Sequence, residues 1–572
     1  MHAPPSREAD LARRATFGRA LDRRARVSRA DLHREARRRL DVERLHPEQA
    51  AAVDALSTGR DALVVMPTGG GKSAIYQLAG ALLDGTTLVV SPLIALQHDQ
   101  LEHIDELDVG DAAVLNSTMG ERERTEVLDR FAAGDLEFLF VAPEQLANPE
   151  TRASIARSDI GLFVVDEAHC VSLWGHDFRP SYLELAAAHR EFGAPVTLAL
   201  TATASPPVRD DVIALLELRD PAVLVAGFDR PNIHLAVERL TDDEAADEHV
   251  LARAGALAGD GIIYTATRAS AEQLAAELVA RGDRAAAYHA GLRASERERV
   301  QAAFMAGDVR VVVATWAFGL GIDKPDVRWV QHHAVPSSVD ALYQELGRSG
   351  RDGEAASHVL WFREVDLQRA RFQGSTTRAD GDHVVAVVEA LRAVPGQTSA
   401  QLGELTKLSR ARVAAVLRAL DDLAALERRG RRRELHVVTI ASAERLAERT
   451  DELEDQRKRI DETRSTMLRA YADANGCRRQ VLLAYFAEAL TDPCGNCDRC
   501  DAGAGASSSS SSAVPAELGL ALQDRVRHAS LGEGTLVQVD GDALTVLFDE
   551  AGYRTLAAGL VADGGLLERV DT

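Results

Sequence analysis

The sequence has no apolar run of about 18 residues, the length that a membrane-spanning helix needs. Its N-terminus is polar and arginine-rich, unlike an export signal. These absences predict a protein that is neither membrane-inserted nor exported, so the cytoplasm is the expected location. Basic residues are also outnumbered by acidic ones, with 66 Lys and Arg against 88 Asp and Glu and a net charge of −22. This excludes general electrostatic attraction to nucleic acid but not a local basic track, because charges are screened beyond about 10 Å.

Cysteine is scarce as well, with five residues in 572. Four of them lie close together, at Cys477, Cys494, Cys497 and Cys500. In a cytoplasmic protein such a cluster is more often a metal site than a set of disulfides. Four thiolates suit a closed tetrahedral zinc site with no open position for catalysis. Reduced thiols without metal and an iron–sulfur cluster are the alternatives.

A chain of 572 residues is too long for one hydrophobic core and predicts roughly three to five domains. The expected segments are an Arg-rich extension (1–40), a first α/β lobe that binds nucleotide (41–225), a second α/β lobe (226–370), a winged-helix-like module (380–440), a zinc-binding subdomain (450–502), a Ser-rich linker (503–515) and a small β-barrel (516–572). For the Arg-rich extension, a charged helical segment and a nucleic-acid-binding arm both stay open.

A glycine-rich loop follows the apolar run that ends at Val65. It reads Met66-Pro67-Thr68-Gly69-Gly70-Gly71-Lys72-Ser73 and lies between a predicted strand and a predicted helix. This spacing is typical of a phosphate-binding loop, in which backbone N–H groups hold phosphates, Lys72 reaches the β and γ phosphates and Ser73 ligates magnesium. A glycine-rich turn without a ligand is the alternative. The predicted nucleotide-binding residues here are Thr68, Gly69, Gly70, Gly71, Lys72 and Ser73.

Short apolar runs alternate with helical patterns through the first half of the chain. The runs in the first lobe are Thr87 to Val90, Phe138 to Val141, Leu162 to Val165 and Val196 to Leu200. This alternation predicts a parallel sheet with helices on both faces, in which ligands collect where strands end. One run ends in the adjacent carboxylates Asp166 and Glu167. A second series of runs begins after Phe228 and has no phosphate loop.

An aromatic and basic loop from Trp174 to Pro180 follows the two carboxylates. Trp174 and Phe178 are candidates to stack on bases. Stacking of this kind is worth roughly 1 to 3 kcal/mol per base. Aromatic side chains so close to a strand end are also consistent with core packing.

Together these motifs resemble the RecQ family of superfamily 2 DNA helicases, over about residues 45 to 370 and 450 to 502. The most discriminating segments are the glycine-rich loop, Asp166-Glu167-Ala168-His169 with the following Trp174 loop, and Ala317-Phe318-Gly319-Leu320-Gly321-Ile322-Asp323-Lys324-Pro325. The resemblance implies two tandem RecA-like parallel-sheet lobes that use ATP and Mg²⁺, a subdomain that holds Zn²⁺, and single-stranded or partly duplex DNA as partner. It also implies unwinding from 3′ to 5′ in recombination or repair, in a short form without the helical HRDC tail.

The resemblance implies that Arg179 links the DNA contact of the aromatic loop to the nucleotide site. It assigns catalytic roles as well. Asp166 would hold magnesium through water, Glu167 would activate the attacking water, and Arg351 would act as an arginine finger from the second lobe. Hydrolysis would then be coupled to closure of the lobes. The residues assigned to catalysis are Lys72, Asp166, Glu167, His169, Gln344, Arg348 and Arg351.

The resemblance also implies that Gln49 binds the edge of the adenine base and that Asp323 contacts the nucleotide. The sequence departs from the family at three places. Met66 stands where the loop usually has its first glycine, Leu173 replaces a usual glutamine, and Val42 occupies the position of an aromatic residue that would stack on adenine.

Beyond the lobes, residues 382 to 440 have the order of a winged helix, with three helices and a basic hairpin. Arg429, Arg431 and Arg432 of the hairpin are predicted to contact DNA phosphates; a helical packing module is the alternative. After the serine run, period-2 strands with glycine turns predict a small β-barrel, similar to the Tudor-like tail of UvrD-type helicases, which implies a protein partner. A tail that adds no function is equally consistent.

Three functions follow from these patterns. The leading hypothesis is an ATP-dependent DNA helicase. The second is a DNA-stimulated translocase that remodels protein–DNA complexes without separating strands, and the third is a zinc-containing DNA-binding adaptor whose motor has decayed. Strand displacement on a tailed duplex separates the first from the second.

Overall fold

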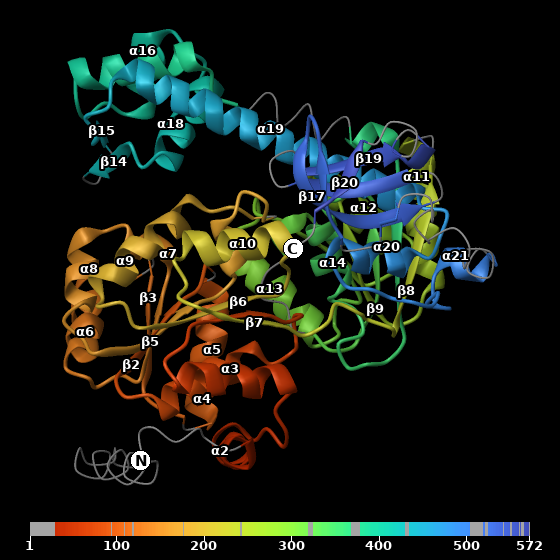
Figure 1. The fold of residues 1–572 in the computed structure, drawn as a ribbon, viewed down its shortest axis with the longest axis horizontal. Helices are drawn as coiled ribbons and strands as arrows, with labels where there is room; N and C mark the ends of the chain where they lie inside the picture. The colour runs from red at the N-terminus through yellow and green to blue at the C-terminus, as the bar shows by residue number, and fades with distance from the viewer. Residues whose placement is uncertain are drawn as a thin grey trace. The chain divides into compact units, whose positions relative to one another are not determined.

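The computed structural model describes residues 29 to 570 with short gaps. The gaps are residues 93, 108, 117–118, 176, 241–242, 319–323, 368–377, 430–433, 504–518, 521–523, 541–542, 549–551, 560 and 562–565. Of the described residues, those up to Phe228 form one compact unit and those from Asp229 onward form a second (Figure 1). No helix in these described segments is both long and apolar enough to cross a membrane.

The first unit is built on a seven-stranded parallel sheet in the order β3-β4-β2-β5-β6-β1-β7. Its strands are β1 (Ala62–Val65), β2 (Thr86–Val90), β3 (Ala112–Leu115), β4 (Phe138–Val141), β5 (Ile160–Val165), β6 (Val196–Thr201) and β7 (Ala222–Val225). Strands β1, β2 and β4 are buried at every residue, because both faces of the sheet are covered. This double coverage explains why they are continuous apolar runs rather than alternating ones.

Helices connect these strands and supply the covering layers. They are α2 (Arg29–Leu40), α3 (Pro47–Ser57), α4 (Lys72–Leu82), α5 (Ile94–Leu107), α6 (Glu121–Ala132), α7 (Pro143–Leu146), α8 (Pro149–Ile155), α9 (Leu185–Glu191) and α10 (Pro206–Leu215), with the 3-10 turns η1 (Ala168–Val171) and η2 (Pro180–Glu184). Leu32, Ala36 and Leu40 of α2 are buried in the same core as β1. The last part of the Arg-rich extension is therefore a packed helix.

The second unit begins with a six-stranded parallel sheet in the order β10-β11-β9-β12-β13-β8. Its strands are β8 (Ile233–Arg239), β9 (Asp260–Tyr264), β10 (Ala285–Tyr288), β11 (Val311–Ala314), β12 (Val327–His332) and β13 (Ala356–Phe362). Its helices are α11 (Asp243–Ala256), α12 (Arg268–Ala280), α13 (Ala294–Met305) and α14 (Val339–Leu346), with the 3-10 turn η3 (Trp316–Phe318). The two parallel sheets confirm the predicted fold class.

Three helices and an antiparallel hairpin follow the second sheet, in the order that the sequence predicts. They are α16 (Gly381–Ala393), α17 (Ser399–Thr406), α18 (Arg410–Asp422), β14 (Leu426–Arg429) and β15 (Glu434–Val437). Their apolar side chains form a separate core, which also takes in Leu446 from the 31-residue helix α19 (Ala443–Asp473). The long helix therefore begins in this module and leads to the cysteine cluster, where α20 (Arg478–Tyr485) and α21 (Asp498–Asp501) lie.

The C-terminal segment is a five-stranded antiparallel sheet in the order β19-β18-β17-β16-β20. Its strands are β16 (Arg525–His528), β17 (Gly532–Asp540), β18 (Ala543–Phe548), β19 (Gly552–Ala557) and β20 (Leu567–Arg569). The predicted all-β segment is confirmed, and its closure into a barrel stays a prediction. Tyr553 packs on α20: its ring stacks on Tyr485 at 5.4 Å between centroids, and its hydroxyl donates to the Tyr485 carbonyl at 3.2 Å.

Candidate nucleotide site and zinc centre

The phosphate loop joins β1 to α4 and depends on its glycines. Gly69 and Gly71 have φ of 80° and 72°, in the left-handed region that side chains disfavour. A Cβ on Gly70 would lie 2.6 Å from Cγ of Met66, so the side chain at the atypical position packs against the loop. Lys72 begins α4, and its ammonium donates to the Met66 carbonyl at 3.1 Å. Lys72 thus lies at the N-terminus of α4, the end of a helix that favours anion binding.

Gln49 is buried and bonded to the phosphate loop. Its side-chain amide donates to the carbonyls of Gly70 at 3.1 Å and Gly71 at 2.9 Å, while its oxygen accepts from the His46 N–H at 2.7 Å. The structure therefore shows Gln49 as a support of the loop, and the adenine contact stays a prediction. Val42 is partly buried against the core of the first lobe.

The adjacent carboxylates stand at the end of β5. Burial, together with the negative charge of Glu167, raises the pKa of Asp166 to about 6, although Lys72 opposes the shift. Asp166 accepts from the Glu167 N–H at 2.9 Å, and Glu167 takes a left-handed φ of 48°. That conformation costs about 1 kcal/mol or more and turns the chain sharply after the strand. Carboxylate and hydroxyl oxygens are ligands that Mg²⁺ prefers, so Asp166 and Ser73 fit a magnesium site.

His169 is held between Glu167 and the end of β6. Its Nδ1 lies 2.8 Å from the hydroxyl of Thr201 and 3.3 Å from Oε2 of Glu167, and the ring is buried. Contact with the ring restricts the carboxylate that would act on water. Thr201 is the last residue of β6, and its contact with His169 gives it a positioning role that the sequence did not predict.

The loop from Trp174 to Pro180 is bonded to two strand ends. Arg179 donates to Asp177 at 2.9 Å and to the Pro92 carbonyl at 3.3 Å, just beyond β2. Tyr182, which the sequence reading missed, is fully buried and donates to the Asp166 carbonyl at 2.8 Å. These hydrogen bonds connect this region to the ends of β2 and β5, and the predicted link between a DNA contact and the nucleotide site stays a prediction. Trp174 and Phe178 are half-buried, and residue 176 lies outside the described residues.

In the second lobe, α14 carries Gln344 and is followed by Arg348, and both residues are buried. Burial raises the pKa of Tyr264 at the end of β9, and the positive charges of Arg348 and Arg351 partly offset that shift. The two predicted catalytic arginines therefore lie close to one phenol. Asp323 lies outside the described residues, so its predicted contact with nucleotide stays a prediction.

A buried polar chain fixes α14 to its sheet. His332 on β12 lies 2.7 Å from the carboxylate of Glu345 and 2.8 Å from Nε2 of His358 on β13. The ring of Tyr264 stacks on His332 at 5.3 Å. Buried polar groups of this kind specify one arrangement because each needs its partner. The helix before the arginine pair is therefore held in a single register.

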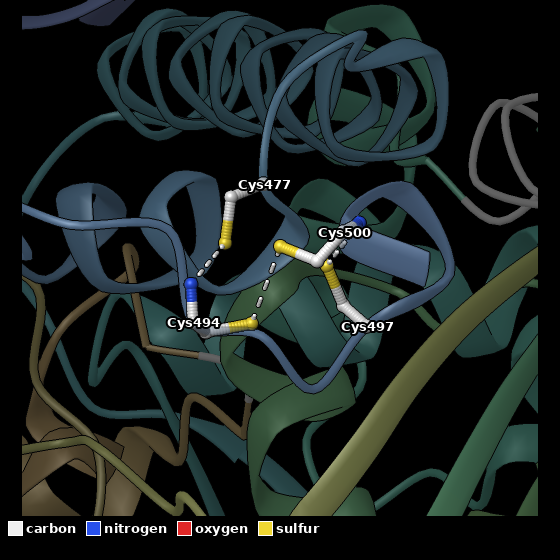
Figure 2. Close-up of side chains that lie close together, drawn as sticks. All are labelled: Cys477, Cys494, Cys497 and Cys500. Carbon is white, nitrogen blue, oxygen red and sulfur yellow. Dashed lines mark hydrogen bonds between the residues drawn. The ribbon is translucent and has the colours of Figure 1, made fainter. Parts of the chain in front are cut away.

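The four cysteines converge on one point, as Figure 2 shows. Their sulfur atoms all lie within 4.8 Å of one another, and those of Cys494 and Cys500 are 4.0 Å apart. A tetrahedral zinc with bonds of 2.3 Å separates its sulfur ligands by about 3.8 Å, so the set fits zinc. Backbone N–H groups of Cys494, Asn496 and Cys500 donate to the sulfurs at 3.3 to 3.5 Å, which favours thiolates.

The cysteine loop also covers the outer edge of the second sheet. β8 is the last strand of that sheet, and its Leu235 forms a parallel bridge with Cys497. Asp498 accepts from the Val237 N–H at 3.2 Å and binds the buried Arg478 at 3.0 Å. The zinc subdomain is therefore attached through main-chain bonds to the edge of the sheet. Tyr485 adds a second attachment, because its hydroxyl donates to the carboxylate of Asp340 on α14.

The predicted DNA-contacting arginines of the hairpin are not tested. Arg429 ends β14, but its side chain, like all of Arg431 and Arg432, falls outside what the structure describes. Their contacts with DNA phosphates stay a prediction.

Three known protein families match the chain. They are the DEAD/DEAH box helicase family over residues 46–212, the helicase conserved C-terminal domain over residues 243–353 and the RecQ zinc-binding family over residues 440–501. Two RecA-like lobes with these motifs define a helicase core of superfamily 2.

Curated relatives narrow that class. The chain is 41% identical over 313 residues to the probable ATP-dependent DNA helicase RecS of Bacillus subtilis, which covers 54% of this chain and 63% of the relative. It is 34% identical over 453 residues to the ATP-dependent DNA helicase RecQ of Pasteurella multocida, covering 79% of this chain and 59% of the relative. With its zinc-binding region, the chain belongs to the RecQ family, and it spans about 60% of the length of these two relatives.

A solved structure agrees in fold. The helicase MrfA bound to DNA matches with a TM-score of 0.51 and 18% identity, over 73% of this chain and 60% of the other.

Proposed function

We propose that this chain is an ATP-dependent DNA helicase that moves 3′ to 5′ on single-stranded DNA and acts in recombination or repair. The observation that carries the proposal is the connection through Tyr182, whose N–H donates to the Arg179 carbonyl at 2.9 Å and whose hydroxyl donates to the Asp166 carbonyl at 2.8 Å. It joins a group suited to magnesium to a loop suited to bases. The names of the relatives, ATP-dependent DNA helicases, and the DNA bound to MrfA support this reading.

The residues of the first lobe divide the chemistry among them. When bound, ATP and Mg²⁺ would supply the phosphoryl group and the charge that neutralises it. Lys72 and the N-terminal turn of α4 would hold the phosphates, and Ser73 and Asp166 would hold the metal. Glu167 would accept the proton of the attacking water, with its carboxylate restrained by His169. Arg348 and Arg351 as donors of positive charge, with Gln344, remain part of the proposal on the strength of the family resemblance.

Binding of DNA would alter the nucleotide site through the loop from Trp174 to Pro180. Stacking on Trp174 or Phe178 would move the loop, and the bonds from Arg179 and Tyr182 would transmit the change to the backbone at Pro92 and Asp166. Zinc would hold the four cysteines together and take no part in ATP hydrolysis. We also propose that the C-terminal sheet binds a protein partner, on a surface other than the one that Tyr553 uses.

Strand displacement tests the proposal. A duplex with a 3′ single-stranded tail, a duplex with a 5′ tail and a blunt duplex are compared with ATP, and Lys72→Ala serves as the inactive control. We expect displacement of the 3′-tailed duplex alone. Stimulation of ATP hydrolysis by single-stranded DNA without displacement of any duplex would favour the translocase instead.

A further inference from the structure

Trp316 is the most exposed of the four tryptophans, with 70% of its surface open. Trp329 and Trp361 are buried at 1% and 5%, and Trp174 is half-buried. Tryptophan is highly buried on average, because its large apolar ring gains by leaving water. An indole left this open is a group available to a ligand.

The local structure holds the indole outward. Trp316 begins the short turn η3, two residues beyond the end of β11. The other end of the turn is anchored by Phe318, which is fully buried and packs against the rings of Tyr288 at 4.6 Å and Phe304 at 5.9 Å. The Phe318 N–H donates to the Thr315 carbonyl at 3.0 Å. One residue of the turn is thus committed to the core while Trp316 stays in solvent.

Neighbouring strand ends add positive charge on the same edge of the sheet. Ala314 is paired with Tyr288 of β10 and with Tyr264 of β9, so the segments that follow these three strands share one edge of the sheet. Arg268 begins α12 on this edge and is exposed, and a Cβ on Gly291 would lie 3.0 Å from its guanidinium. Arg293 caps α13 and is also exposed.

This edge therefore combines an exposed ring with two guanidinium groups and two helix N-termini, which attract phosphates. A nearby carboxylate, that of Glu272, is bonded to the buried ring of His289 at 3.0 Å. An apolar peptide would match the indole but not the arginines, whereas a polynucleotide matches both. Stacking on an aromatic ring tolerates any base, because every base has a π-face.

We propose that Trp316 stacks on a base of a single strand bound along this edge, so that the second lobe holds the strand by a base as well as by phosphates. The inference rests on the proposed function and names a contact in the second lobe that none of the predicted DNA-binding residues supplies. Trp316 would act as a binding residue and not as a catalytic one.

Tryptophan fluorescence tests the contact directly. In a Trp174→Phe protein, the remaining indoles other than Trp316 are buried, so a change on binding reports on Trp316. We expect a thymidine oligonucleotide to quench the emission, and an abasic oligonucleotide of equal length, which offers phosphates without bases, to leave it nearly unchanged. Adding Trp316→Phe should remove the thymidine-dependent quench.

Binding measurements supply the second readout. Trp316→Ala should raise the Kd for the thymidine strand by about 5- to 100-fold and leave the Kd for the abasic strand unaltered. Trp316→Phe, which keeps a ring, should stay within a few-fold of wild type. Val279→Ala removes a 54%-exposed side chain near the other end of α12 and is the matched control, with no expected change. The basal ATPase rate without DNA should be the same in Val279→Ala as in wild type.

Two outcomes would overturn the inference, and each can be told from failure of the proposed function. If the thymidine strand binds with wild-type affinity to Trp316→Ala, or if the abasic strand quenches as strongly as thymidine, Trp316 makes no stack while the helicase proposal stands. If wild-type protein neither binds a single strand nor is stimulated by it, both proposals fall together.

Discussion

The two parallel sheets of this protein have the same architecture and opposite chemistry where their strands end. In the first lobe the strand ends carry the half-buried carboxylate of Asp166 and the buried carboxylate of Glu167, close to Lys72. In the second lobe they carry the exposed indole of Trp316 and the exposed guanidinium of Arg268. A parallel sheet fixes where a ligand binds, whereas the side chains at the strand ends decide which ligand it is.

The two lobes also differ in what their buried polar groups interact with. Asp166 has a raised pKa because it is enclosed next to a second acid, and such a pair is suited to a cation. The buried polar groups of the second lobe, His332 with Glu345 and His358, bind one another instead and fix α14. We therefore expect that a change at the first set removes chemistry and a change at the second removes stability.

The largest effect is expected from substitutions of two buried glutamates, which test whether the first lobe supplies the chemistry and the second set of polar groups supplies stability. Glu167→Gln should lower ATP turnover by about 10²- to 10⁴-fold, because the amide cannot accept the proton from water. Glu345→Gln is the matched change in the second lobe and should lower the melting temperature with a much smaller loss of turnover. Steady-state ATPase rates and thermal melting of both proteins give the comparison. Equal losses of turnover would show that the lobes do not divide chemistry and stability in this way.

The zinc centre extends the comparison to the outer edge of the second sheet. Cys494→Ser should release the metal and destabilise the second unit by about 3 kcal/mol or more, because a structural zinc is part of the folding free energy. Binding of an ATP analogue by the first lobe should persist in the protein that remains folded. Zinc content and calorimetry measure the change. An unaltered melting temperature with full zinc content would contradict it.

Substitutions in the C-terminal sheet test whether the second unit folds as one body. Tyr553 is 2% exposed, so Tyr553→Ala should cost about 3 kcal/mol of unfolding free energy through the lost stack on Tyr485. Tyr553→Phe keeps the ring and loses one hydrogen bond, and should cost about 1 kcal/mol. Denaturant titration gives both values, and limited proteolysis locates the loosened segment. A neutral Tyr553→Ala would mean that the sheet folds independently of α20.

The smallest effect concerns pH. Burial, with the positive charge of neighbouring groups, holds the pKa of His358 well below its usual value of 6.5. The unfolded chain therefore takes up a proton near pH 6.5 that the folded chain refuses, so stability is lost as pH falls below 6.5. This residue contributes a slope of about 1.4 kcal/mol per pH unit. Melting temperatures between pH 7.5 and 5.5 should fall less steeply in His358→Gln, and parallel curves would refute the assignment.

The strand, loop and helix around the candidate nucleotide site could be predicted from the sequence because they are local. A strand, a glycine loop and a helix stand next to one another between Ala62 and Leu82, and the cysteine triplet is as compact. The family resemblance supplied the order of the lobes and the roles of the residues. Strands β3 and β7 were not predicted, because their alanines have weak strand preference and the runs are short.

Contacts between residues far apart in the chain could not be predicted from the sequence. The stack of Tyr553 on Tyr485 joins residues 68 positions apart, and neither position carries a local signal for its partner. The bonds of Gln49 to the phosphate loop depend on how α3 packs beside it. The exposure of Trp316 runs against the usual burial of tryptophan, so only the anchoring of Phe318 beside it explains the outward ring.

The bridge between Leu235 and Cys497 has a further consequence, for self-association. β8 is an edge strand of seven residues, and an uncovered edge offers its N–H and carbonyl groups to any other strand, including the same strand of a second copy. The cysteine loop occupies part of that edge. Removal of zinc would therefore do more than loosen the fold, because it would uncover an edge strand that can pair with a strand of another copy. Concentration-dependent light scattering after chelation, with no scattering before it, is the sign to look for.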